Sequence, residues 1–369
     1  MNDTLYTVYC DTTPPVLHCQ QKITSEYDQS TRDPYIVYCV TNINTPFDNY
    51  NTQLLEHLRI NPTSIMLLIH DWSPPDTTAD IYEKIIKFTN LQPEQYYFVV
   101  MDPLDADSIK NGLAERGIYG INFIGRNSLL IDETIVYDPL PKSPEKLFSV
   151  FCRSSREWRL HFYCDLIATK LLDECIYSYI NASPYIPGEY PTELSEIKKM
   201  MPSIYAGDPT IRDTIHAWVD GMPYALVENL ADYNSLRLFE TISKSYIHII
   251  LETMHTGTVH HVTEKTWKAV SVKKPFMLYG VPGCLQWLHK RGYKTFHPYI
   301  NEDYDLEEDP IKRKDMIICE MRNIAKLSPE ELTHLAQNCN PAVEHNHRLF
   351  LEEKKFKWPE EFAKLGIFK

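Results

Sequence analysis

Short apolar segments of strand length alternate with segments of helical spacing along much of this chain. The strands expected in the first half cover residues 35–41, 64–70 and 96–101. Residues 79–90 and 107–116 carry apolar side chains at the spacing of an amphipathic helix, and Gly117 is a candidate left-handed residue after the second helix. The alternation predicts the α/β fold class, with helices layered on a mainly parallel sheet.

The second half repeats the alternation more strongly. The strands expected there cover residues 146–151, 246–251, 275–280 and 293–296. The helices expected there cover residues 159–181 and 282–291, with a third that begins at Glu264 behind Thr263 as N-cap and a fourth over 310–327. The βαβαβ pattern near residues 246–296 is typical of a nucleotide-binding half-sheet, whose ligands lie at the carboxyl ends of the strands.

The chain length favours two domains. At 369 residues the chain exceeds the size at which a single hydrophobic core stops growing. Residues 137–144 contain three prolines and read as a hinge between domains. We therefore expect a Rossmann-like N-terminal domain over residues 1–140 and a nucleotide-binding C-terminal domain over residues 146–369, which ends in a helical tail.

Charge and composition exclude several classes of protein. The net charge of −13 makes duplex DNA an unlikely partner, although a local basic pocket remains compatible with it. No apolar run approaches the roughly 20 residues that span a bilayer, and residues 1–15 lack the pattern of a signal peptide. The nine cysteines form neither a CxxC pair nor a regular disulfide framework. We expect a soluble, cytoplasmic protein.

Charged side chains gather at two junctions where a helix begins. Arg153, Arg156 and Arg159 follow the strand over 146–151, where backbone N–H groups at a helix start and guanidinium groups together suit an anion. Glu264 and Lys265 begin a later helix, and a lysine there is unfavourable toward the helix dipole unless an anion compensates it. A bound diphosphate would do so, while Glu264 accepts hydrogen bonds from ribose hydroxyls. Solvated surface charge is the alternative interpretation of both groups.

A candidate general base follows one of the early strands. Asp71 lies directly after residues 64–70, in a proline-rich loop that holds a carboxylate at the end of a strand. Asp102, after residues 96–101, is its nearest rival, and capping of a loop is the alternative role for either residue. The common phosphate-loop, dinucleotide, metalloprotease and nucleophile-elbow motifs are absent from the sequence.

Three histidines are candidate metal ligands. His260 and His261 are adjacent, and His255 lies shortly before them. Adjacent side chains on a strand point to opposite faces and rarely share one ion. We therefore expect these histidines to lie at the surface or to line a cleft, and we expect neither a metal nor another cofactor.

The C-terminal half resembles the donor-binding region of the α1,3-fucosyltransferases. In that family a Phe-Glu-Asn-(Ser/Thr) sequence is followed by Tyr-Val-Thr-Glu-Lys, a helix, and then a proline and a strand that ends in glycine. Glu252, the residues Val262-Thr-Glu-Lys265, Pro275 and Gly280 fit this pattern in order. The resemblance covers mainly residues 146–296. A weaker likeness, beyond residue 292, connects the chain to uncharacterised phage and giant-virus glycosyltransferase-like proteins and suggests a viral or microbial origin.

The resemblance implies a GT-B architecture, in which two Rossmann-like domains face each other across a cleft, with the donor site in the C-terminal domain and the acceptor side in the N-terminal one. It implies an inverting, metal-independent transfer of fucose or a similar sugar from a nucleoside diphosphate sugar, GDP-fucose by default, to an acceptor hydroxyl on a glycan or another molecule. The donor would then be held by Arg153, Arg156, Arg159, Glu252, Glu264 and Lys265, and Asp71 would be the catalytic base.

Two departures from the family pattern leave alternatives open. The asparagine that follows the family's glutamate is Thr253 here, and the catalytic glutamate is replaced by the shorter Asp71. The alternatives are a viral transferase that glycosylates modified DNA bases, and a GT-B-fold protein that binds a nucleotide or a glycan without turnover.

Overall fold

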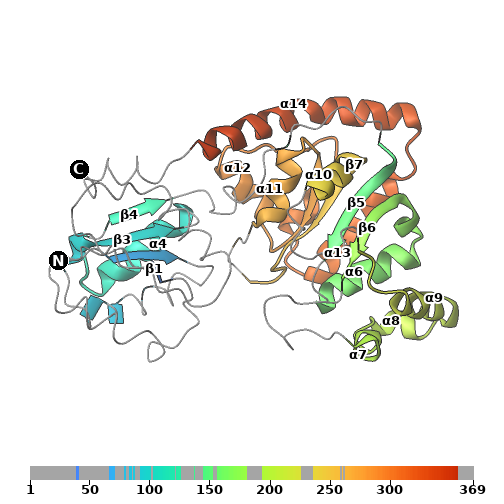
Figure 1. Cartoon of the computed structure of the whole chain (residues 1–369), viewed down its shortest axis with the longest axis horizontal. Coiled ribbons are helices and arrows are strands. Elements are labelled where there is room, and N and C mark those ends of the chain that lie inside the picture. Colours follow the sequence, from blue (N-terminus) through green and yellow to red (C-terminus); the bar gives the residue numbers. More distant parts are fainter. Residues whose placement is uncertain are drawn as a thin grey trace, which may run out of the picture. The chain divides into compact units, whose positions relative to one another are not determined.

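The computed structural model describes residues 39–40, 66–70, 79, 83–84, 86–87, 92–100, 103–120, 122–125, 137, 144–152, 156–180, 193–225, 236–257, 260 and 262–355. The chain divides into two compact units, one of Met1–Leu130 with Lys355–Lys369 and one of Ile131–Lys354 (Figure 1). The boundary that the sequence suggests, between residues 140 and 146, falls inside the second unit of this division.

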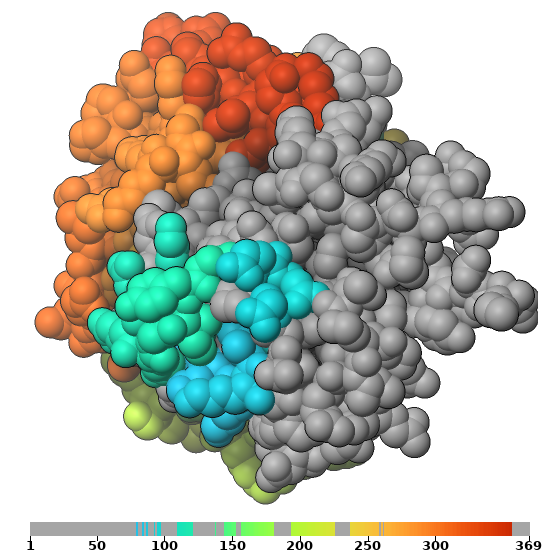
Figure 2. All heavy atoms as spheres, turned by 90° about the vertical axis from the view of Figure 1, so that its left-hand side faces the viewer, coloured from blue at the N-terminus to red at the C-terminus, as the bar shows by residue number. Residues whose placement is uncertain are grey.

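The first unit contains a four-stranded parallel sheet in the order β1-β2-β3-β4. Its elements are β1 (Cys39–Val40), β2 (Met66–His70), the 3-10 helix η2 (Pro93–Gln95), β3 (Tyr96–Val100), α4 (Pro103–Glu115) and β4 (Asn122–Gly125). Tyr96, Ile109 and Leu113 are buried, so β3 and α4 supply much of the core described here. The described side chains of the unit form adjoining cyan and teal surfaces in Figure 2. Gly117, with φ of +75°, ends α4 as expected.

The second unit contains another four-stranded parallel sheet, in the order β6-β5-β7-β8. Its strands are β5 (Lys146–Cys152), β6 (Cys175–Tyr179), β7 (Ser245–Leu251) and β8 (Phe276–Tyr279). The helices are α6 (Glu157–Ala168), η3 (Leu171–Glu174), α7 (Leu194–Lys199), α8 (Ser203–Ala206), α9 (Pro209–Asp220), α10 (Leu236–Ser243), α11 (Glu264–Ser271), α12 (Cys284–Lys290), η5 (Asp303–Leu306), α13 (Pro310–Ile324) and α14 (Pro329–Lys354). The predicted α/β class with parallel sheets is confirmed in both units.

In the second sheet the chain adds strands first on one side of β5 and then on the other. From β5 the chain moves outward to β6, then returns to the other side of β5 to form β7 and β8. Because crossovers between parallel strands are right-handed, this reversal puts α6 on one face and α10 and α11 on the other. Asp165 of α6 pairs with Lys314 of α13, whereas Phe239 and Ile242 of α10 pack with Val272 after α11. The carboxyl ends of β5 and β7 therefore form a topological switch point, where such sheets bind ligands.

The long helix predicted over residues 159–181 is wrong. Helix α6 ends at Ala168, Lys170 takes a left-handed φ of 60°, and the chain then forms η3 and β6. Strand β6 pairs with β5 from Cys175 to Tyr179. Leu171 and Ile176 match the helical period by position, but the aromatic and β-branched run of β6 suits a pleated strand better. The helical spacing of apolar residues continues past the end of α6 at Ala168, so this spacing does not show where the helix ends.

The strand predicted over residues 293–296 is also wrong, for a different reason. The backbone of Lys294 bonds to the side chain of Asn346 in α14: the Lys294 N–H donates to Oδ1 at 2.8 Å, and Nδ2 donates to the Lys294 carbonyl at 2.7 Å. A buried amide side chain from the tail therefore satisfies backbone groups that a neighbouring strand would otherwise satisfy.

Helix α14 covers the outside of α11. It begins in a capping box, in which the Ser328 N–H donates to Glu331 at 2.8 Å and the Glu331 N–H donates to the Ser328 hydroxyl at 3.3 Å. Its red surface lies beside the orange segment of the same unit in Figure 2. None of the helices in the described part of the chain is long and apolar enough to cross a membrane.

The centre of the second sheet contains a buried polar chain. His248 of β7 lies 2.8 Å from the hydroxyl of Ser149 in β5, which lies 2.8 Å from the hydroxyl of Ser245. Burial, with the nearby charge of Lys268, lowers the pKa of His248 to about 3. The imidazole is therefore neutral in the folded protein at ordinary pH, and the ring is available as a hydrogen-bonding partner.

The lowered pKa of His248 makes the stability of the folded protein depend on pH. Between pH 6.5 and 3 the unfolded chain binds a proton at His248 that the folded chain does not bind, so the free energy of unfolding falls as the pH falls through this window, by up to about 1.4 kcal/mol per pH unit. We expect His248→Gln to flatten this slope in urea denaturation curves between pH 7 and 4. The matched control is His334→Gln, at an exposed position, which keeps the wild-type slope. Equal slopes in wild type and His248→Gln would contradict the prediction.

Candidate functional site

Two arginines of α6 contact the backbone that follows β7. Arg159 is 4% exposed, and its Nη2 donates to the carbonyl oxygen of Glu252 at 2.8 Å. Arg156, the N-cap residue of α6, donates from Nη1 to the carbonyl oxygen of Thr253. The site thus joins the helix that follows β5 to the end of β7, at the switch point of the sheet.

Lys265 reaches the same place from the first turn of α11. Its Nζ donates to the hydroxyls of Thr253 at 3.0 Å and Thr263 at 2.8 Å, and it lies 3.8 Å from Glu252 and 3.4 Å from Glu264. The side chain keeps 24% of its surface exposed. Three cations from two helix starts therefore converge on residues 252–253, and the ammonium group remains reachable from solvent.

Glu252 lies beneath this group of cations and is fully buried. One oxygen accepts from the Thr263 N–H at 2.9 Å and the Thr266 hydroxyl at 2.8 Å. The other accepts from the Thr263 hydroxyl at 2.6 Å and the Thr253 N–H at 3.3 Å. The carboxylate is thus engaged with its own chain, and it ties the segment between β7 and α11 to the end of the strand.

Arg313 of α13 supports the same segment, and sequence reasoning missed it. Its side chain is 1% exposed, and its guanidinium group donates to the carbonyl oxygens of Gly280, at 3.1 Å, and His255. An arginine in an otherwise ordinary amphipathic helix gives no signal of this contact. Thr266 was also missed, because a threonine within a helix gives no signal that its hydroxyl contacts a distant carboxylate. The predicted N-cap role of Thr263 is confirmed, since its hydroxyl accepts from the Lys265 N–H.

Arginines near His255 create a positive field at this residue, although the chain is acidic overall. Burial, together with the charges of Arg313, Arg156 and Arg159, lowers the pKa of His255 to about 4. The His255 ring stacks on Trp158 with centroids 4.7 Å apart, and the Arg159 guanidinium lies 4.9 Å from the centroid of the same indole. Such a field favours an anionic ligand.

Several predicted site residues lie outside the described residues: Arg153, Asp71, Asp102 and His261. The strands before the two aspartates are described, and they are neighbours: β2 pairs with β3, with His70 opposite Val100. His260 Nε2 lies 3.1 Å from the carbonyl oxygen of Pro282. Within the part of the chain that the structure describes, no group of three or more histidine, cysteine, aspartate or glutamate side chains could hold a metal ion.

No family model matches the chain, and no curated protein matches its sequence. Solved structures that resemble it include T4 phage BGT in complex with its UDP-glucose substrate, at 10% identity and a TM-score of 0.40 over 92% of this chain and 84% of the other. They also include an α,α-trehalose-phosphate synthase (UDP-forming) from Burkholderia vietnamiensis, at 11% identity and a TM-score of 0.45 over 95% and 75%. Membership of the α1,3-fucosyltransferase family stays a prediction.

The hydrogen bonds of Glu252 predict a large effect on stability. Glu252→Ala leaves the donors of Thr263 and Thr266 buried without an acceptor, and we expect the free energy of unfolding to fall by about 3 kcal/mol. Glu264→Ala is the matched control, because Glu264 is partly exposed and begins α11, so its loss costs less than about 1 kcal/mol. Chemical denaturation of the two variants measures both values. Similar losses in both would show that the buried carboxylate does not organise the segment.

Proposed function

We propose that this chain is a glycosyltransferase that takes its sugar from a nucleoside diphosphate sugar. The observation behind the proposal is the convergence of Arg156, Arg159 and Lys265 on residues 252–253, at the switch point of a doubly wound parallel sheet. Fixed guanidinium and ammonium groups beside two helix N-termini are the groups that proteins use to bind phosphates. The motif resemblance to α1,3-fucosyltransferases supports the same donor class.

The proposed reaction is a direct displacement. The oxygen of an acceptor hydroxyl attacks the anomeric carbon, and the bond from that carbon to the diphosphate oxygen breaks. The electron pair of this bond leaves with the nucleoside diphosphate, and the hydroxyl proton passes to a carboxylate. Because the reaction is a direct displacement, the anomeric configuration inverts. The cations stabilise the negative charge that grows on the leaving oxygen, which is the role that a metal ion has in other transferases.

Each predicted residue has a proposed part in this reaction. Asp71 is the base, with Asp102 as the alternative, and Arg153 joins the phosphate-binding cations. Glu264 accepts hydrogen bonds from the ribose or sugar hydroxyls of the donor. Glu252 shapes the donor site from below by holding the segment from which Lys265 projects. We propose GDP-fucose as the first donor to try and a glycan hydroxyl as the acceptor, because the resemblance implies both.

Loss of Lys265 is expected to weaken donor binding. Lys265→Ala removes a partly exposed ammonium group from the proposed diphosphate site, and we expect a Kd for GDP or UDP that is about 10-fold higher or more. Isothermal titration in a buffer with EDTA measures this value and tests metal independence at the same time. Lys290→Ala, at an exposed position on α12, is the control and keeps the wild-type Kd. Binding that needs added Mg²⁺, or that is equal in the two variants, would contradict the proposal.

Loss of Asp71 is expected to stop transfer and spare binding. Asp71→Asn removes the proton acceptor but keeps the size of the side chain, so we expect the rate of sugar transfer to fall by a factor of about 100 or more while the Kd for the nucleoside diphosphate stays unchanged. Asp102→Asn, assayed in parallel, identifies the base if Asp71→Asn retains its rate. A wild-type chain that binds the donor and transfers no sugar to any hydroxyl would favour a binding protein without turnover.

A further inference from the structure

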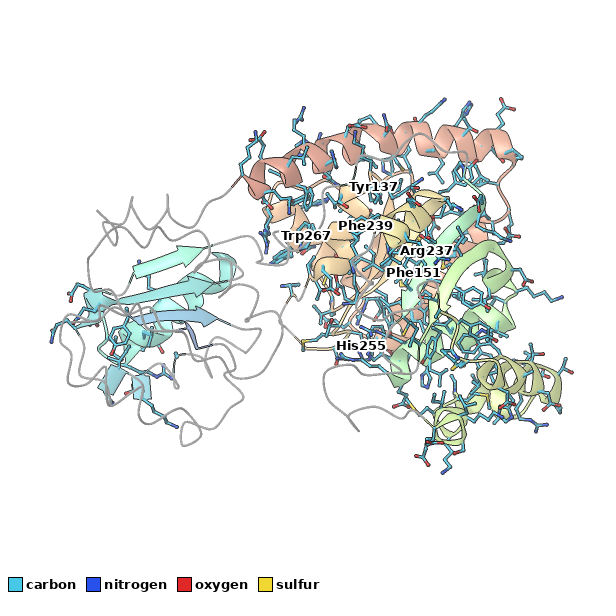
Figure 3. All side chains as sticks on the ribbon, viewed as in Figure 1. Tyr137, Phe151, Arg237, Phe239, His255 and Trp267 are labelled. Carbon is cyan, nitrogen blue, oxygen red and sulfur yellow. The ribbon has the colours of Figure 1, made fainter. Side chains whose placement is uncertain are left out.

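A pocket of about 190 Å³ lies next to Arg156 and Arg159, on the face of the sheet that α6 and α13 cover. Its walls come from the start of α6, the loop after β7, the end of β8 and the start of α13, and they include Trp158, His161, His255, Tyr279, Ile311 and Lys314. His255 marks its position in Figure 3, well apart from the packed cluster of Tyr137 and Phe239. Trp158 connects the pocket to the site, because the guanidinium group of Arg159 lies against its ring.

The charges around the pocket do not suit a phosphate. Lys314 is buried and forms an ion pair with Asp165, so its charge is already balanced, and the acidic Glu157 lies at the rim. His255, stacked on Trp158, is neutral at ordinary pH because of its surroundings. The positively charged side chains of Arg156, Arg159 and Lys265 lie instead around residues 252–253. A ligand that spans both places has its anionic part at the cations and an uncharged part in the pocket.

The size and lining of the pocket favour a flat ring. Its volume is below the roughly 300–1,000 Å³ of pockets that hold whole drug-sized ligands, so it has room for one ring system rather than for a complete nucleotide. The lining is mainly aromatic and apolar, from Trp158, Tyr279 and Ile311. The polar groups of the lining are Glu157, His161, His255 and Lys314. Nucleobases bind well to aromatic side chains and require few hydrogen bonds.

We propose that this pocket is the base-binding subsite of the donor, and that Lys314 is a specificity-determining residue that donates a hydrogen bond to an acceptor on the edge of the base. The proposal rests on the function proposed above, in which the adjoining cations bind the diphosphate. Asp165 accepts from the hydroxyl of Tyr205 and pairs with the Lys314 ammonium, which fixes the position of Nζ at the pocket. An ammonium has three N–H donors, so its pairing with Asp165 and its contact with Asp315 at 3.5 Å leave one donor for a base.

A substitution at the rim tests the position of the base. Ile311 is 64% exposed and lines the pocket, so Ile311→Trp fills the pocket without changing the core. We expect the Kd of the tightest nucleoside diphosphate among GDP, UDP, ADP and CDP to rise about 10-fold or more, while the Kd of inorganic pyrophosphate stays the same. The control is Leu306→Trp, at a position 62% exposed that does not line the pocket, and it leaves both values unchanged.

The outcomes separate this proposal from the proposed function. Unchanged nucleotide binding in Ile311→Trp, or an equal loss for nucleotide and pyrophosphate, overturns the base subsite and leaves the diphosphate site standing. A wild-type chain that binds neither pyrophosphate nor any of the four nucleotides overturns the proposed function itself. Saturation-transfer NMR gives a second readout: the base protons, rather than the ribose protons, are expected to receive most of the saturation.

A paired substitution tests Lys314. The double variant Asp165→Asn, Lys314→Gln replaces the buried ion pair with two amides that can bond to each other, which avoids a lone buried charge. We expect the differences in Kd among the four nucleotides to shrink to within about threefold, with pyrophosphate binding unchanged. A wild-type chain that binds the four equally, or a double variant that keeps the original ranking and spread, overturns the role of Lys314.

Discussion

The buried carboxylate of Glu252 is the interaction on which the geometry of the site depends. A carboxylate away from water is costly unless hydrogen-bond donors surround its oxygens, and here Thr253, Thr263 and Thr266 supply them. All these donors belong to the segment that begins directly after the carboxylate, so Glu252 folds that segment back onto the end of β7. The start of α11, and with it the ammonium group of Lys265, is fixed as a consequence.

The cations occupy positions that stability alone does not favour. Arg156 is the N-cap of α6 and Lys265 lies in the first turn of α11, where the positive end of each helix dipole repels them. Backbone carbonyls of Glu252 and Thr253 and the nearby carboxylates compensate part of this repulsion. Two such compromises at one place are unusual for a purely structural region. They are consistent with a chain that retains the arrangement for an anionic ligand.

Parts of the fold and the site follow from short-range sequence patterns, and the rest depends on contacts between distant residues. Strand-length apolar runs identified β2, β3, β5, β7 and β8, because a short continuous apolar run suits a strand of a parallel sheet. Thr263 and Lys265 could be placed because a cap and a misplaced charge are local signals. The role of Asn346 beside Lys294 could not be predicted. An amide side chain that bonds to the backbone in place of a neighbouring strand leaves no recognisable pattern in the nearby sequence. The same holds for Arg313, whose partners come from β8 and the loop after β7.

The site can form only after β5 has paired with β7 during folding. Ser149 and His248 are 99 positions apart in sequence, and Arg159 is 93 positions from the carbonyl that it contacts. Closing so long a loop costs conformational entropy before the contacts form, so we expect this pairing to form late in folding. A chain that has formed only β5, α6 and β6 presents its arginines without the backbone that orients them. The three cations are therefore brought together only with the central strand pair, as a property of the completed sheet.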